Sequence, residues 1–245
     1  IHYETMEISS YFSENRVKWD QFYPSEKKLL DSLDLQADQT VLDVGCGCGG
    51  LGIALNERYA ISSYTGIDIN NEAITTGREM TPSFSFIAGD ILDATDNALN
   101  GHYFDLVCSL GCVDWNVQFT DMLAAAWRHV KPGGKFVSTF RLSIGEGCSD
   151  LKETYQYINY EGKKEGEIAA YVVLNFNSLM CDLLQLEPSA IKGTGYWGKP
   201  GPSAVTPYET LCFVAFSITK RNEGEIGDAN IDLDLPDDIL ETLEV

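Results

Sequence analysis

Residues 41–50 read Val-Leu-Asp-Val-Gly-Cys-Gly-Cys-Gly-Gly, an apolar run that passes directly into a glycine-rich turn. The run has the length of a buried strand, and the following residues, Leu51 to Tyr59, are typical of a helix. Glycines let a backbone turn tightly and approach a ligand closely. The stretch therefore predicts a strand, a ligand-binding turn and a helix, although a turn that only packs the helix on the strand would look the same.

Short β-rich runs alternate with helical patterns beyond this turn. The strand-like runs cover residues 40–44, 63–67, 83–88, 104–110 and 135–140, and two more follow at 191–196 and 211–219. Such alternation predicts βαβ units and a parallel sheet. We expect an α/β fold with a seven-stranded, mostly parallel, doubly wound sheet whose last strand is antiparallel.

We expect residues 1–221 to form a single domain in which two further segments surround the predicted core, and an acidic tail to follow it. Residues 1–35 are predicted to form an N-terminal helical cap. Residues 141–170 are expected to be a substrate-side insertion after strand 5, because ligands bind open α/β sheets at the carboxyl ends of strands. Residues 222–245 carry nine acidic and no basic residues, which predicts a solvated, partly disordered acidic tail.

The amino-acid composition excludes some classes of binding partner for this protein. The 245 residues include 17 Lys and Arg against 37 Asp and Glu, a formal net charge of −20, and such a surface repels nucleic acid. The seven cysteines are scattered, which suggests neither a disulfide framework nor a metal site. Without a long apolar run or a signal pattern, we expect a cytoplasmic protein that needs no membrane. The sequence leaves undecided whether the protein forms a homodimer.

Three carboxylates follow or precede the predicted strand ends. Asp68 lies 23 residues beyond Gly45, where an acid can accept hydrogen bonds from both ribose hydroxyls of a nucleoside, and this spacing also fits NAD. Asp43 precedes the first glycine and Asp90 ends the third strand. Asp43 would repel a pyrophosphate but not an amino acid that carries a sulfonium, so these acids argue against NAD.

Taken together, residues 43–49, Asp68, Gly89-Asp90, residues 104–107 and residues 123–134 resemble the class I (Rossmann-like) S-adenosylmethionine-dependent methyltransferases. The resemblance covers about residues 36–142. It implies S-adenosylmethionine as the cofactor and S-adenosylhomocysteine as the product. It places Gly45 and Gly47 against the methionine part, Asp68 on the ribose, and Asp90 with Ile91 at the adenine. The cofactor site implied by the resemblance also includes Asp43, Cys46, Ile69, Gly89, Ser109 and Leu110.

The segment before the first strand mixes charge and aromatic residues. In relatives such a segment closes over the cofactor, so Arg16 is expected to pair with the methionine carboxylate, and Trp19 or Tyr23 to cover it. An amphipathic helix that packs on the sheet edge is an equally good interpretation.

The acceptor side is expected after the fourth strand. Asp114 is the best-placed catalytic carboxylate and Trp115 a wall of the acceptor site, although Asp114 could equally cap the next helix. Tyr171, Tyr196 and Trp197 suit an acceptor pocket. The segment 193–200 is similar to sugar-pathway methyltransferases. We expect methyl transfer to an O or N atom of a small molecule, with a sugar or nucleotide sugar as a candidate acceptor. A non-catalytic S-adenosylmethionine-binding module and an NAD-dependent oxidoreductase are the alternatives.

Overall fold

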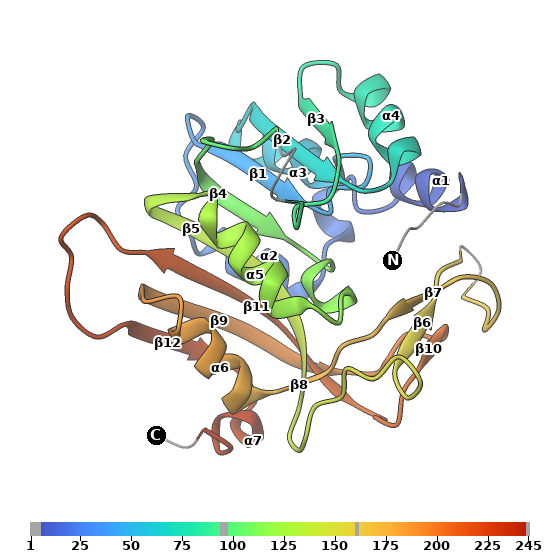
Figure 1. Ribbon diagram of the computed structural model, residues 1–245, viewed down its shortest axis with the longest axis vertical. Coiled ribbons are helices and arrows are strands. Elements are labelled where there is room, and N and C mark those ends of the chain that lie inside the picture. The colour runs from blue at the N-terminus through green and yellow to red at the C-terminus, as the bar shows by residue number, and fades with distance from the viewer. Residues whose placement is uncertain (1–5, 94–97, 160–161, 244–245) are drawn as a thin grey trace.

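The computed structural model describes residues 6–93, 98–159 and 162–243. Helices α1 (Met6–Glu14) and α2 (Pro24–Asp31), with a short 3-10 turn at Trp19–Gln21 between them, precede the first strand (Figure 1). The parts of the predicted cap, insertion and tail at 1–5, 160–161 and 244–245 lie outside the described residues.

The first half of the sheet follows the predicted alternation closely. Val41, Leu42 and Val44 are almost fully buried, because helices cover both faces of this strand. The elements are β1 (Thr40–Val44), α3 (Gly50–Tyr59), β2 (Ser63–Asp68), α4 (Asn71–Met80), β3 (Ser85–Ala88), β4 (Phe104–Ser109), α5 (Phe119–Arg128) and β5 (Val130–Ser143). All neighbouring pairs among these strands are parallel, with Val44 opposite Ile67 and Leu42 opposite Val107.

The antiparallel finish comes from two long strands, β9 (Pro188–Gly198) and β11 (Leu211–Lys220). Strand β11 lies between β5 and β9 and is antiparallel to both. The described residues give the order β12-β9-β11-β5-β4-β1-β2-β3, and β8 (Leu174–Asn175) also pairs with β5. The sheet thus has nine strands; the seven predicted strands are present, and the short strands β8 and β12 are additional.

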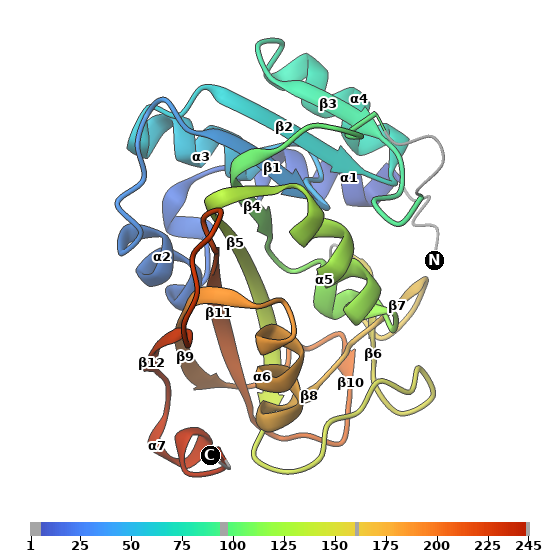
Figure 2. The same cartoon turned by 60° about the vertical axis from the view of Figure 1, so that its left-hand side comes forward.

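Two apolar layers enclose the sheet, one on each face (Figure 2). The first contains residues of α5 and α6 (Phe176–Leu184), together with Phe136, Phe140 and Phe216 of the sheet. The second contains residues of α2 and α3, packed against other side chains of β1, β4, β5 and β11. Burial on both faces explains why these strands read as nearly continuous apolar runs.

The acidic tail differs from its expectation. Asn230–Asp234 forms β12, which pairs in parallel with β9, and α7 (Asp237–Leu240) follows it. Leu235 is 7% exposed and Ile239 is fully buried in the first apolar layer. The net charge predicts a solvated extension, but the apolar residues between the acids anchor the segment to the sheet.

The insertion contributes two of the three strands of a second sheet. The strands of this sheet are β6 (Tyr155–Tyr157), β7 (Ile168–Ala170) and β10 (Ala204–Val205), in the order β10-β6-β7. This sheet lies beside the carboxyl-terminal part of β5 (Figure 1). Because β5 extends to Ser143, the insertion begins later than the predicted residue 141, and the remaining domain boundaries stay predictions. Among the described residues, no helix has the length and apolar character needed to cross a membrane.

Candidate nucleoside and acceptor site

The backbone N–H groups of the glycine turn donate to groups at the end of β2. Gly45, Gly47 and Gly49 all have positive φ, at 73°, 53° and 82°, a conformation that only glycine adopts without cost. The N–H groups of Gly45 and Cys46 donate to the carbonyl of Ile67, at 2.8 and 3.2 Å. The Gly47 N–H donates to Oδ2 of Asp68 at 2.8 Å. These three donors are therefore engaged, and the turn does not present them to a pyrophosphate as an anion-binding nest would.

Side chains close the turn from two sides. A Cβ atom at Gly45 would lie 2.4 Å from Sγ of Cys112, and a Cβ atom at Gly47 would lie 3.3 Å from Cγ of Phe12 in α1. The Cys46 thiol packs beneath the turn, where a Cβ atom at Gly66 would lie 2.6 Å from Sγ. The Cys46 side chain therefore lies in the core, where the residue is 8% exposed, and its place in the cofactor site stays a prediction.

Asp68 is held at the end of β2 by backbone donors. Its Oδ2 accepts from Gly47 and its Oδ1 accepts from the N–H of Asn70 at 2.8 Å. Burial raises the pKa of Asp68, and these hydrogen bonds oppose that rise. Asn70 caps α4 through Oδ1, while its Nδ2 is buried without a hydrogen-bond partner. Ile69, between them, is half-buried.

Asp43 is a buried acid with one neutral donor. The Tyr64 hydroxyl donates to Oδ2 of Asp43 at 2.6 Å, and the Asp43 residue is 4% exposed. Burial raises the pKa of Asp43 to about 7, with the Tyr64 hydrogen bond and the charge of Arg16 opposing the rise. Asp43 thus changes its charge near neutral pH.

The predicted site residues of the N-terminal segment lie in two different places. Arg16 forms an ion pair with the buried Glu26 at 2.9 Å, and its guanidinium lies over the ring of Tyr23. A Cβ atom at Gly50 would lie 2.2 Å from the carbonyl oxygen of Arg16, so the segment contacts the turn directly. Trp19 instead packs against Tyr59, at the end of α3 far from the glycines. The structure thus brings Arg16 to the turn and does not bring Trp19 there.

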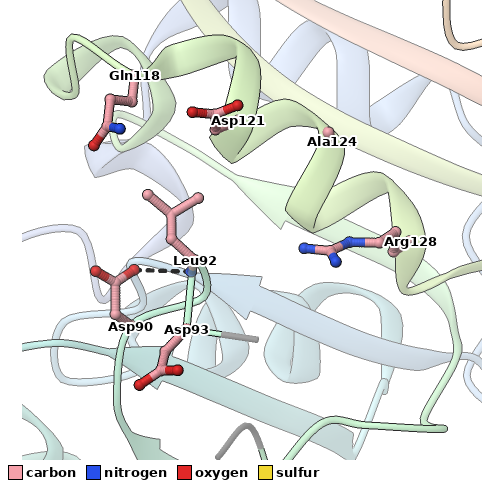
Figure 3. Close-up of a pocket in the computed structure, with 7 residues that line it drawn as sticks. All are labelled: Asp90, Leu92, Asp93, Gln118, Asp121, Ala124 and Arg128. Atoms are coloured by element: carbon pink, nitrogen blue, oxygen red, sulfur yellow. Dashed lines mark hydrogen bonds between the residues drawn. The ribbon is translucent and has the colours of Figure 1, made fainter. Parts of the chain in front are cut away.

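The residues after β3 border a hollow of about 760 Å³ (Figure 3). Asp90 is exposed, and its Oδ1 accepts from the N–H of Leu92 at 2.9 Å. Ile91 is 5% exposed and belongs to the apolar core, so its side chain is not displayed to the hollow. The hollow is lined by Asp90, Leu92, Asp93, Gln118, Asp121, Ala124 and Arg128. Among the predicted cofactor residues, only Asp90 lines it.

Open space also surrounds two glycines at neighbouring strand ends. Nothing lies within 4 Å of a Cβ atom built at Gly89, after β3, or at Gly111, after β4. Ser109 and Leu110, predicted to line the methyl group, are buried, and Oγ of Ser109 has no hydrogen-bond partner. The carboxyl ends of β3 and β4 therefore combine open space with an unsatisfied polar atom.

Asp114 lies in a buried ion pair in the loop after β4. Its Oδ2 is 3.1 Å from Nη1 of Arg141, and both side chains are at most 6% exposed. Its Oδ1 is buried without a hydrogen-bond partner. Burial raises the pKa of Asp114, and the charge of Arg141 opposes the rise. The alternative role as a helix cap is not seen, because the residue before α5 is Gln118.

Aromatic rings surround this ion pair. The Arg141 guanidinium lies 3.8 Å from the ring centre of Tyr171 and 5.5 Å from that of Trp115. Tyr171 is 2% exposed, and burial raises its pKa to about 12. Both rings therefore contact Arg141, and Tyr171 supports the ion pair from within the core.

Tyr196 and Trp197 point to opposite faces of β9. Tyr196 stacks on Phe213, whose ring also stacks on Tyr23, with ring centres 5.9 and 6.5 Å apart. The Trp197 indole N–H donates to Asp238 of α7 at 2.9 Å. Because adjacent strand residues face opposite sides, one acceptor pocket cannot include both rings, and Trp197 belongs to the contact with the tail.

Arg141 is the functional candidate that sequence reasoning missed. A charged residue inside the apolar run 136–142 was the available signal, since an arginine is rarely buried without a partner. The predicted start of the insertion at residue 141 concealed that signal. Within the described ranges, no group of His, Cys, Asp and Glu has the arrangement of a metal site.

Comparison with known proteins agrees with this geometry. The family described as "Methyltransferase domain" matches residues 41–134. Phosphoethanolamine N-methyltransferase 1 of Zea mays is 27% identical over 147 residues, which are 59% of this chain and 28% of that protein. Trans-aconitate 2-methyltransferase of Deinococcus radiodurans is 30% identical over 95 residues, 38% of this chain and 34% of that protein. The chain thus spans about a third of the length of these relatives.

The fold has solved counterparts. Phosphoethanolamine N-methyltransferase 2 of Haemonchus contortus, in complex with S-adenosyl-L-methionine, superposes with a TM-score of 0.58 at 14% identity, covering 88% of this chain and 56% of that one. The sheet order and the antiparallel β11 are therefore features of a Rossmann-like methyltransferase fold. Residues 41–134, which hold the glycine turn and the following strands, match a methyltransferase domain, and the chain has the Rossmann-like fold of class I S-adenosylmethionine-dependent methyltransferases.

Proposed function

We propose that this protein transfers a methyl group from S-adenosylmethionine to an oxygen or nitrogen atom of a small-molecule acceptor. One observation carries the proposal. Four buried side-chain polar atoms of the described residues lack a hydrogen-bond partner, and three of them lie at or just beyond the carboxyl ends of β2 and β4: Asn70 Nδ2, Ser109 Oγ and Asp114 Oδ1. Unpaired buried polar groups cost free energy, so their concentration beside the glycine turn indicates a site that a polar ligand completes.

The charges around the turn favour a cationic ligand over a dinucleotide. Asp43 lies near Asp68, and among the described residues the cations that act on Asp43 and Asp114 are Arg16 and Arg141, both of which are already paired with acids. A sulfonium and an ammonium group are attracted to this excess of acid, whereas a pyrophosphate is repelled. Together with the engaged turn donors, this balance argues against the NAD-dependent alternative.

Asp114 is the proposed proton acceptor. When bound, S-adenosylmethionine supplies a methyl carbon activated by positive sulfur, and positioning contributes much of the catalysis. Oδ1 of Asp114 is free to accept the O–H or N–H proton of the acceptor, and burial raises the pKa of this carboxyl, which favours proton uptake. Arg16, Asp43, Asp68, Asp90 and Ser109 are proposed cofactor contacts, and Tyr23 and Tyr196 are proposed walls of the acceptor side.

A transfer assay tests the proposal directly. The protein is incubated with S-adenosylmethionine labelled on the methyl group and, separately, with phosphoethanolamine, trans-aconitate, monosaccharides and nucleotide sugars. We expect label in at least one product, and Asp114→Asn to lower its rate by about 10²–10⁴-fold. Asp38→Asn, at an exposed position before β1, is the matched control and should leave the rate unchanged. Binding of S-adenosylhomocysteine without transfer to any acceptor would support the non-catalytic alternative instead.

A further inference from the structure

A buried arginine is directed at the carboxylate to which we assign proton transfer. Nη1 of Arg141 lies 3.0 Å from the backbone carbonyl oxygen of Asp114, 3.4 Å from that of Val172, and 3.1 Å from Oδ2 of Asp114. One nitrogen thus contacts both the backbone and the side chain of Asp114. The N–H of Val172 donates to the same carbonyl of Asp114 at 3.0 Å, so β5, the loop after β4 and the segment before β8 meet here.

The guanidinium is itself immobilised. Arg141 is 5% exposed, and its position in β5 is fixed opposite Phe213 in β11. The Tyr171 ring, at 3.8 Å, and the Trp115 ring, at 5.5 Å, bound the guanidinium. An arginine held by packing on a strand loses little further freedom when it orients a partner, which is the arrangement expected for a supporting residue.

We infer that Arg141 is the positioning residue of Asp114, which holds the carboxylate through Oδ2 and leaves Oδ1 as the atom that receives the acceptor proton. The inference rests on the proposed function only for the destination of the proton. The asymmetry is visible in the structure, because Oδ2 is paired while Oδ1, equally buried, has no partner.

Arg141 also affects the charge of Asp114. Its charged neighbours are Arg141 from β5, Arg16 from the segment after α1, and Glu26 from α2. Tyr171 and Cys112 also face it, and both are neutral near pH 7 because burial raises the pKa of each. Burial and Glu26 favour the protonated acid, and Arg141 is the group that most favours the carboxylate, which is the form that can act as a base.

An NMR titration tests this role without any acceptor. The protein is labelled with ¹³C at the aspartate side-chain carboxyl, and the Asp114 signal is assigned by its disappearance in Asp114→Asn. We expect Arg141→Gln to raise the titration midpoint of Asp114 by about one pH unit or more, because an opposite charge in contact lowers a carboxyl pKa by about 1–3. Arg141→Lys, which keeps the charge, should give a smaller rise, and Arg128→Gln in the distant hollow should give none.

The outcomes separate this inference from the proposed function. Should Arg141→Gln fail to fold, Arg141→Lys still tests the role, because its ammonium cannot keep the stacking of the guanidinium on the Tyr171 ring. An Asp114 midpoint that stays unchanged in every folded Arg141 variant would overturn the positioning role, even if Asp114→Asn abolishes methyl transfer. A shifted midpoint in a protein that transfers no methyl group would keep the positioning role and reject the proposed function.

Discussion

Gly45→Ala tests the closed geometry of the glycine turn. Residue 45 has φ of 73°, and the added Cβ would lie 2.4 Å from Sγ and 2.7 Å from Cβ of Cys112. An L-residue in the left-handed region costs about 1–2 kcal/mol. Inserting a methyl group into a filled site costs about 1–3 kcal/mol more. We therefore expect Gly45→Ala to lower the free energy of unfolding by roughly 2–5 kcal/mol.

Urea denaturation followed by circular dichroism measures this change, and Gly111→Ala is its matched control. Gly111 has φ of 66° but nothing within 4 Å of its Cβ position, so only the backbone cost of about 1–2 kcal/mol applies. Adding Cys112→Gly to Gly45→Ala should recover the difference between the two variants. The reasoning is refuted if Gly45→Ala and Gly111→Ala are equally destabilised, since the contact with Cys112 would then not exist.

Three further predictions follow from the charges and the tail. Because burial raises the pKa of Asp43 to about 7, the folded state binds more protons than the unfolded chain between about pH 4 and 7, so this group's contribution to stability falls as pH rises through that window and is constant above it. Tyr64→Phe removes a donor that lowers this pKa, so the window should extend to higher pH in urea titrations, and a window that does not move would count against the Tyr64 contact. Leu235→Ala should cost about 2–5 kcal/mol because Leu235 is 7% exposed, whereas Ile231→Ala, at 43%, should cost far less; equal losses in thermal unfolding would argue that the tail is not docked. Lys28→Ala breaks an exposed ion pair with Asp234 and should change stability by at most about 1 kcal/mol, so a larger loss would show that this pair anchors β12.

The parallel half of the fold was predictable because its strands are short, apolar and separated by helices. Burial on both faces of β1, β2 and β4 leaves a continuous apolar signal, and the glycine turn marks where the first strand ends. The prediction of a solvated tail was wrong because charged residues dominate the composition of residues 222–245. Two apolar residues, Leu235 and Ile239, are too few to produce a periodic pattern in the sequence. Their side chains are nevertheless buried, and this burial docks the segment on the sheet.

The site was predicted less completely than the fold. Asp68, Asp43 and Asp114 follow from strand ends, which local sequence reveals. The partner of Asp114, by contrast, depends on a contact between residues 27 positions apart, which no local pattern encodes. Trp19 and Trp197 were expected near ligands because aromatic residues suit pockets, but the structure turns Trp19 toward α3 and Trp197 toward α7.

The measurement that tests the central claim most directly is calorimetric titration with S-adenosylmethionine, S-adenosylhomocysteine and NAD in separate runs, repeated on Asp68→Ala. We predict that both sulfur nucleosides bind, that NAD does not, and that Asp68→Ala abolishes binding, because this carboxylate is fixed by the Gly47 and Asn70 donors at the end of β2. Binding of NAD alone, or full binding of S-adenosylhomocysteine to Asp68→Ala, would contradict the account.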